Sequence, residues 1–195
     1  MNIYIDFDDT ITTSVENIVR IVNKRYGRKA KADDITRWDF SDIYPDIPRE
    51  EIVSIFGEEE FFNSLHIKPY VLVSLHKLSK RNKVFIVSKV DNVAMMRKGE
   101  WIRKNINSLG IDVEFVGIPL TMSKGIIDME GGIMIDDNSH FLDETNAKYK
   151  ILFDNQRMKE VTDRWDGARF SDWKSLYKYL AEIIAKEKGI KNGKI

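Results

Sequence analysis

Two short apolar runs in this sequence each lead directly into a pair of aspartates. Residues 3–8 read Ile-Tyr-Ile-Asp-Phe-Asp, and residues 133–137 read Ile-Met-Ile-Asp-Asp. Apolar runs of this length predict buried strands. In open parallel α/β sheets, ligands sit outside the carboxyl ends of the strands, near the point where the strand order reverses. Two neighbouring strands of this kind would therefore aim their carboxylates into one crevice.

The first acidic pair has a geometry that calls for a positive partner. Backbone alternation places Asp6 and Asp8 on one side of the strand and Phe7 on the other. Because carboxylates held close together repel, they need a cation or a shared proton between them. Mg²⁺ suits such a site, since it accepts one or two carboxylates together with water and substrate phosphate. The alternative is an acidic turn that merely ends a strand.

A hydroxyl and a lysine lie between the two acidic pairs in the sequence. The apolar run 84–87 ends at Ser88, and Lys124 lies within Thr-Met-Ser-Lys-Gly, residues 121–125. Together with the aspartates, they are suited to handling a phosphoryl group. Taken alone, Ser88 would be a strand-end hydroxyl that caps the next turn. Lys124 alone would be a solvated loop lysine, with Lys89 as a competitor for phosphate.

The order and spacing of these residues resemble the haloacid dehalogenase (HAD) superfamily. Asp6-Phe7-Asp8-Asp9-Thr10 fits its first motif, DxDx[T/V], and the later motifs resemble Ser88, Lys124 and Ile135-Asp136-Asp137 in turn. Within the superfamily, the chain resembles the 5'(3')-deoxyribonucleotidases and their bacterial and phage relatives. This narrower resemblance rests on the patterns at residues 35–39, 60–69 and 135–138.

The resemblance implies a Mg²⁺-dependent phosphomonoesterase that acts through an aspartyl-phosphate and hydrolyses deoxyribonucleoside 5'(3')-monophosphates. It implies that Asp6 is the nucleophile and a metal ligand. Asp8 is expected to be the general acid and base, with its backbone carbonyl on the metal. Asp9, where many relatives carry glycine, is expected to have a supporting or capping role.

The remaining motifs imply roles in binding the metal and the phosphoryl group. Asp136 resembles the second metal carboxylate, and Asp137 is expected to act from outside the direct ligands by ordering a metal-bound water or Lys124. Ser88 is expected to donate a hydrogen bond to a phosphoryl oxygen. Lys124 is expected to pair with Asp6 and with the transferring phosphate.

Aromatic residues concentrate in the stretch that follows the first predicted helix. Stacking of a nucleobase on aromatic rings is worth about 1–3 kcal/mol per base. An aromatic slot over the base is therefore one interpretation of this stretch, and the other is that the same rings form the core of a small insert. The candidate substrate-binding residues are Trp38, Phe40, Phe61 and Phe62.

The alternation of apolar runs and amphipathic stretches predicts an α/β fold with helices on both faces of a parallel sheet. The resemblance implies an HAD-like Rossmannoid three-layer sandwich, five strands in the order 3-2-1-4-5, and a small helical cap inserted after the first strand and helix. The predicted divisions are core residues 1–14 and 69–188, cap residues 15–68, and tail residues 189–195.

Several boundaries are predicted from local signals. Thr13 and Glu16 have the spacing of a capping box at the start of the first helix. A helix is predicted near residues 97–109, and the last helix is predicted to start at Ser171. Residues 154–170 carry no chemistry that the sequence assigns.

The composition of the chain limits the classes of partner that it can bind. The 195 residues carry a formal net charge of zero and no cysteine. A neutral chain has no strong field for nucleic acid or membrane, and the lack of cysteine excludes thiolate chemistry. No apolar run reaches the roughly 20 residues that span a bilayer, and no signal pattern opens the chain. We therefore expect a cytoplasmic protein with a small phosphomonoester as its partner; the oligomeric state stays open, a homodimer included.

Three other functions compete with the deoxyribonucleotidase hypothesis. The same chemistry could act on a sugar phosphate or another small phosphomonoester. A receiver domain also places acids, Mg²⁺, a hydroxyl and a lysine at strand ends, but its phospho-accepting acid after the third element is replaced here by Ser88. A non-catalytic nucleotide-binding module would have no need for Asp8.

Overall fold

The structure, a computed structural model, describes residues 1–189, so the predicted tail lies outside the described residues except for Gly189. Its centre is a parallel sheet with the strand order β3-β2-β1-β4-β5-β6. The strands are β1 (Asn2–Asp6), β2 (Lys83–Val90), β3 (Glu114–Pro119), β4 (Ile133–Asp136), β5 (Tyr149–Phe153) and β6 (Ala168–Phe170). The α/β class and the predicted 3-2-1-4-5 order are confirmed.

The prediction of five strands is wrong, because a sixth strand lies at the sheet edge. β6 pairs in parallel with β5, with Ala168 opposite Ile151 and Phe170 opposite Phe153. It has only three residues, none of them fully buried. So short an edge strand lacks the apolar run that identifies a buried strand in a sequence.

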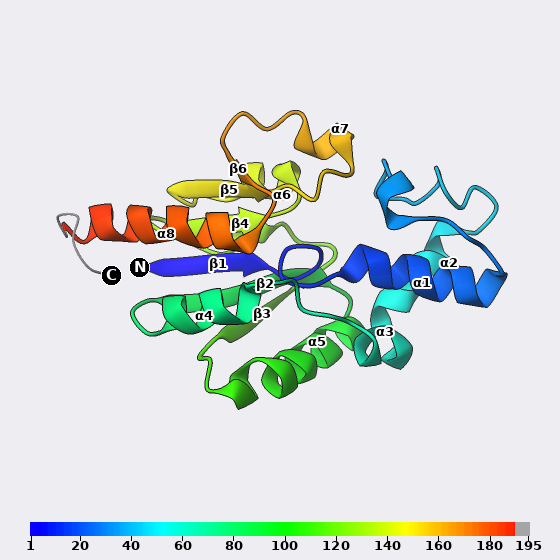
Figure 1. The fold of residues 1–195 in the computed structure, drawn as a ribbon, viewed down its shortest axis with the longest axis horizontal. Helices are drawn as coiled ribbons and strands as arrows, with labels where there is room; N and C mark the ends of the chain where they lie inside the picture. The colour runs from blue at the N-terminus through cyan, green and yellow to red at the C-terminus, as the bar shows by residue number, and fades with distance from the viewer. Residues whose placement is uncertain (190–195) are drawn as a thin grey trace.

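Helices pack on both faces of the sheet and extend beyond one of its ends (Figure 1). The α-helices are α1 (Ser14–Tyr26), α2 (Arg49–Ser54), α3 (Glu59–Asn63), α4 (Val71–Ser79), α5 (Asn92–Asn105), α6 (Ser139–Glu144), α7 (Lys159–Thr162) and α8 (Trp173–Glu187). Short 3₁₀ turns are η1 (Ala32–Asp34), η2 (Ile55–Gly57), η3 (Asn107–Leu109) and η4 (Lys124–Ile126).

The apolar side chains of the strands sort into two clusters by alternation. Ile3 and Ile5 of β1 belong to the larger cluster, which includes buried residues of α4, α5 and α8. Tyr4, which points the other way, belongs to the smaller cluster with Leu142 of α6. The sheet is therefore the middle layer of three.

Two helix starts differ from the predicted ones because aspartates cap them, and a third lacks its predicted cap hydrogen bond. Asp91 accepts hydrogen bonds from the amides of Val93 and Ala94, so α5 begins at Asn92 rather than near 97. Asp172, not Ser171, caps α8. The Thr13 side chain makes no cap hydrogen bond on α1, so the predicted capping box is absent there.

The segment predicted as the cap, residues 15–68 and here called the cap segment, begins and ends at one place on the core. Thr12 and Ile67 form an isolated antiparallel bridge, with hydrogen bonds from Thr13 N to His66 O and from Lys68 N to Ile11 O. In Figure 1, β1 points toward the end of the molecule where α1, α2 and α3 lie. The cap segment therefore lies beyond the carboxyl ends of the strands.

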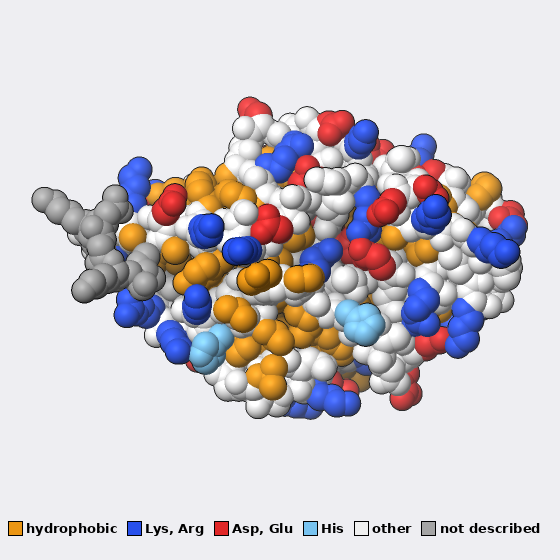
Figure 2. Space-filling view, in the orientation of Figure 1, with side chains coloured by type: hydrophobic (Ala, Val, Ile, Leu, Met, Phe, Trp, Pro, Cys, Tyr) orange, Lys and Arg blue, Asp and Glu red, His pale blue; other side chains and the backbone are white. Residues whose placement is uncertain are grey.

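The surface carries both signs of charge. Figure 2 shows basic and acidic side chains interspersed over the face in view, as a formal net charge of zero leads one to expect. Within residues 1–189, none of the helices combines the length and the apolar character needed to cross a membrane.

Candidate active site

The sheet register brings the two acidic strand ends together. Ile5 of β1 lies opposite Ile135 of β4, so Asp6 and Asp136 follow as neighbours at the carboxyl edge. One carboxylate oxygen each from Asp6, Asp136 and Asp137 lies within 4.8 Å of the others, and all three residues are buried. Because β1 and β4 lie side by side at the centre of the sheet, the sequence prediction of one shared crevice agrees with this geometry.

Lys124 lies inside this acidic cluster. Its Nζ donates to Asp6 Oδ1 at 2.5 Å and to Asp136 Oδ2 at 2.6 Å. The Lys124 and Asp136 side chains are both 0% exposed. The η4 turn holds the lysine there, and its first residue is Lys124 itself. The structure thus places Lys124 against Asp6, as the sequence predicted, and against Asp136 as well.

One ammonium does not neutralise three buried carboxylates. Burial raises the pKa of Asp6 to about 7 against the opposing effect of Lys124, and Asp136 and Asp8 raise it further. Burial and the charges of Asp6 and Asp136 hold the pKa of Asp137 well above its usual range. Burial also raises the pKa of Asp136 despite its contact with Lys124. The cluster of Asp6, Asp136 and Asp137 therefore has more carboxylates than Lys124 alone can neutralise.

This donor set fits a hard divalent cation. Three carboxylates around a common point supply oxygen ligands of the kind that Mg²⁺ accepts. Their raised pKa values report mutual repulsion and desolvation, which a bound cation would relieve. Asp6, Asp136 and Asp137 are thus the residues that could hold a metal through their side chains.

Asp8, the fourth predicted metal residue, has its carboxylate engaged elsewhere. Its Oδ1 accepts from Ser14 Oγ at 2.7 Å, and its Oδ2 pairs with the ammonium of Lys98. Its backbone carbonyl accepts from the Thr10 amide at 2.6 Å. A carbonyl oxygen has a second lone pair, so it stays available as a ligand.

Lys98 is a member of the site that sequence reasoning missed. Its side chain is 1% exposed, and its Nζ also donates to Ser88 Oγ at 2.8 Å. The signal was present in the helix pattern. Lys98 falls on the buried stripe of α5 with Ala94, Trp101 and Ile102, where a lysine is out of place unless it has a partner.

Ser88 lies where the sequence predicted, but not at a strand end. β2 continues to Val90, and Ser88 is paired with Gly117 of β3. Its hydroxyl therefore projects from an ordered strand rather than capping a turn. Lys89, the other lysine considered for binding phosphate, lines the cavity next to the acids. Its Nζ lies over the Phe141 ring, 5.6 Å from the ring centroid.

Asp9 has the capping role that the sequence predicted. Its Oδ1 accepts from the Val15 amide at 2.9 Å, which satisfies an amide in the first turn of α1. Asp9 takes a left-handed φ of 52°, a conformation that aspartate tolerates better than most residues. Arg157 approaches Asp9 Oδ2 at 3.4 Å and also pairs with Glu16. Burial raises the pKa of Asp9 to about 6.

A cavity of about 450 Å³ opens above the acids. Asp6, Asp8, Ser88, Lys124 and Asp137 line it from the core side. The cap segment contributes the opposite wall through Trp38, Arg49, Val53 and Phe56. An adjoining cavity of about 560 Å³ shares these four wall residues and Phe141. Arg49, Phe56 and Phe141 escaped sequence reasoning because nothing in their spacing marks them.

The four predicted aromatic residues divide between this cavity and the interior. Trp38 lines it, and Phe40, almost fully buried, lines only the adjoining one. Phe61 is 0% exposed and packs edge-on against Phe62.

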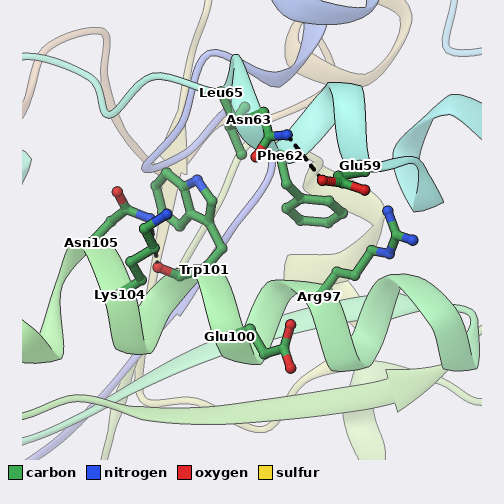
Figure 3. A pocket seen from close by; sticks show the side chains of 9 residues that line it. All are labelled: Glu59, Phe62, Asn63, Leu65, Arg97, Glu100, Trp101, Lys104 and Asn105. Carbon is green, nitrogen blue, oxygen red and sulfur yellow. Dashed lines mark hydrogen bonds between the residues drawn. The ribbon is translucent and has the colours of Figure 1, made fainter.

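Phe62 faces a different cavity, between α3 and α5. Figure 3 shows its ring between the side chains of Trp101 and Arg97. The structure therefore brings Trp38 alone of the four to the acids, whereas Phe61 packs against Phe56 and Phe62 inside the protein.

Sequence comparison relates this chain to nucleotidases. A family model described as "5' nucleotidase, deoxy (Pyrimidine), cytosolic type C protein" matches residues 1–188. A 5'(3')-deoxyribonucleotidase of Clostridium acetobutylicum is 29% identical over 183 residues, which are 92% of this chain and 96% of the relative.

Comparison of structures relates the fold to HAD hydrolases. A haloacid dehalogenase-like family hydrolase from Streptococcus pneumoniae superposes with a TM-score of 0.60 at 16% identity, over 91% of this chain and 97% of that one. A HAD hydrolase of Bacillus subtilis, solved bound to magnesium, has a TM-score of 0.57 at 12% identity, over 92% and 97% of the two chains. At these identities the likeness establishes the fold.

Proposed function

Because the chain belongs to the family of cytosolic type C 5'-nucleotidases, we propose that it hydrolyses deoxyribonucleoside 5'- or 3'-monophosphates through Asp6 with the help of Mg²⁺. As a member of this family it is a nucleotidase, which is a phosphomonoester hydrolase. The single observation that carries the proposed chemistry is the buried cluster of Asp6, Asp136 and Asp137 around one lysine.

The first step of the proposed reaction transfers the phosphoryl group to Asp6. A carboxylate oxygen of Asp6 attacks phosphorus, and the bond between phosphorus and the ester oxygen of the nucleoside breaks. Asp8 must be protonated in this step and gives that proton to the leaving oxygen; its ion pair with Lys98 belongs to the ionised form, which acts in the second step. Lys124 and the Ser88 hydroxyl face the same cavity and are placed to donate to the phosphoryl oxygens.

The second step releases phosphate. Asp8, now ionised, takes a proton from water, whose oxygen attacks phosphorus while the bond to Asp6 breaks. The products are phosphate and the original Asp6 carboxylate. Asp6, Asp136 and the carbonyl of Asp8 would hold Mg²⁺, with Asp137 beside them, and the ion would neutralise charge between the attacking carboxylate and the phosphate.

The cap segment supports a nucleotide as the substrate. We propose that residues 15–68 form a lid whose inner wall, with Trp38 and Phe56, stacks against the base. The description of the family names pyrimidines, which supports dUMP and dTMP over purine deoxynucleotides. The same description, "cytosolic type", supports a cytoplasmic location.

The test is phosphate release from a panel of substrates, with Mg²⁺ and with EDTA. The panel holds dUMP, dTMP, dAMP, UMP, a thymidine 3'-phosphate and a hexose phosphate. We expect Mg²⁺-dependent turnover of the pyrimidine deoxynucleotides, and none by Asp6→Asn, whose circular dichroism should match the wild type. Preference for the hexose phosphate would make a sugar phosphate the substrate in place of a deoxynucleotide and would leave the proposed chemistry unchanged. Full activity of Asp6→Asn would exclude Asp6 as the nucleophile.

A further inference from the structure

The carboxylate of Asp8 is held from two sides by different parts of the chain. Ser14, the first residue of α1, donates to Oδ1 at 2.7 Å. Lys98, on the core helix α5, pairs with Oδ2. Ser14 is itself 0% exposed, and its Oγ lies 2.9 Å from the Thr12 hydroxyl, which donates to the carbonyl of Phe7. Both oxygens of Asp8 thus have a fixed partner.

The burial of Lys98 indicates that this arrangement is specific. An ammonium that is 1% exposed has lost its hydration and depends on its protein partners. Besides Asp8 and Ser88, the Nζ of Lys98 lies over the Phe7 ring, 4.9 Å from its centroid. Phe7 lies between Asp6 and Asp8 in the loop, so Lys98 contacts that loop at two points.

The hydrogen bond between Lys98 and Ser88 also limits where the Ser88 hydroxyl can point its own proton. An ammonium can only donate, so Ser88 Oγ must accept from Lys98 at 2.8 Å. The proton of the Ser88 hydroxyl is then free for another acceptor. Ser88 lines the cavity that Asp6 and Lys124 also line, so the acceptor within reach of that proton is a group bound in the cavity.

We propose that Lys98 and Ser14 are positioning residues. They fix the Asp8 carboxylate for proton transfer, and Lys98 also turns the Ser88 proton toward the phosphoryl group. This inference rests on the proposed function, in which Asp8 is the acid and base. The polar contacts of Lys98 are to Asp8 and Ser88, and those of Ser14 are to Asp8 and Thr12, so we assign both residues a role through these neighbours, although Lys98 also lines the cavity.

The proposal predicts an effect that depends on the leaving group. A nucleoside oxygen leaves poorly without a proton, whereas p-nitrophenolate leaves with little help. Displacing Asp8 should therefore slow transfer from dUMP, by about 100-fold. With p-nitrophenyl phosphate the first step should persist, while hydrolysis of the aspartyl-phosphate, which needs Asp8 as the base, should slow.

The experiment is rapid-mixing kinetics with dUMP and p-nitrophenyl phosphate on Lys98→Met and Ser14→Ala. For p-nitrophenyl phosphate, the ratio of the first-turnover rate to the steady-state rate should rise at least about tenfold over the wild type. The matched controls are Lys104→Met, an exposed lysine on α5, and Thr13→Ala, the neighbouring hydroxyl. Both controls should keep the wild-type rates.

The possible results distinguish the positioning roles of Lys98 and Ser14 from the proposed function of the enzyme. Equal losses on both substrates, with the rate ratio unchanged, would overturn the positioning roles: the residues would then support the fold or, for Lys98, which lines the cavity, contact the phosphate directly. Wild-type turnover by both variants would also overturn the proposal. If Lys98→Met fails to fold, Ser14→Ala decides alone. A wild-type enzyme that leaves dUMP intact would contradict the proposed function, whereas an active wild type with unaffected variants contradicts only the positioning roles.

Discussion

At the scale of single residues, the site is governed by an imbalance of charge. Lys124 contacts Asp6 and Asp136, and within residues 1–189 no other cation pairs with the cluster of three acids. Asp6, Asp136 and Lys124 would each be costly to bury alone, and Lys124 stabilises both carboxylates, which repel each other. The lysine therefore serves the folded state as well as the proposed phosphoryl transfer.

Lys124→Met should expose this dual role. Removing one partner of a buried ion pair leaves uncompensated charge, so the free energy of unfolding in EDTA should fall by about 3–5 kcal/mol. Mg²⁺ should then raise the melting temperature of the variant more than that of the wild type, because the cation replaces the lost charge. Thermal unfolding with EDTA and with Mg²⁺ measures both effects.

The control for Lys124→Met is Lys148→Met. Lys148 forms an exposed pair with Glu187 at 2.8 Å, and exposed pairs contribute little. A loss in Lys148→Met as large as in Lys124→Met would show that burial is not the cause. A melting temperature of Lys124→Met that does not change on adding Mg²⁺ would contradict a cation site at the acids.

At the scale of elements, the start of α1 depends on a buried acid rather than on its own N-cap. Asp9 accepts from the Val15 amide, yet burial raises the pKa of Asp9 from 3.8 to about 6. Folding therefore disfavours its ionised form. The stability that the protonated carboxyl provides is complete below about pH 4 and is lost as the pH rises through about 6.

Asp9→Asn should consequently stabilise the protein in a pH-dependent way. Asparagine keeps the acceptor for Val15 and tolerates the left-handed backbone. It removes the ionisation, so the gain should reach up to about 3 kcal/mol near pH 7.5 and be much smaller near pH 4.5. Urea unfolding in EDTA at the two pH values measures it. A gain of equal size at both pH values would show that the charge of Asp9 is not responsible.

The strands were predictable because each buried strand is a short apolar run, and their acidic ends follow from chain order. Asp6, Ser88, Lys124 and Asp136 were therefore within reach of sequence reasoning. Helix starts were harder to predict from the sequence, since the choice of Asp91 or Asp172 as a cap depends on side-chain geometry. β6 and the partners of Lys98 depend on tertiary contacts between distant segments, which no local pattern encodes.

At the scale of the whole molecule, one cavity joins the chemistry of the core to the walls of the cap segment. The acids come from strand ends, whereas Trp38 and Phe56 come from the stretch between α1 and α3. Trp38→Ala should raise the KM for dUMP by about tenfold, since a base loses its stacking partner. The KM for p-nitrophenyl phosphate should change much less.

Steady-state kinetics on both substrates measure the role of Trp38. Tyr70→Ala is the control, because Tyr70 is an exposed aromatic residue that lines neither of the two cavities. Its KM values should equal those of the wild type. If Trp38→Ala raises the KM for both substrates equally, Trp38 would be a packing residue rather than a base-stacking one.

The bridge between Thr12 and Ile67 has a consequence for how such a protein can diversify. The chain leaves the core and returns to it at adjacent backbone positions, so some fifty residues form a closed loop with its ends already joined. Loop-closure entropy grows only with the logarithm of loop length. An insert of another size or fold could therefore be spliced at this junction at little entropic cost. The fold thus separates the part that performs the chemistry from a part that can be exchanged to accept a different substrate.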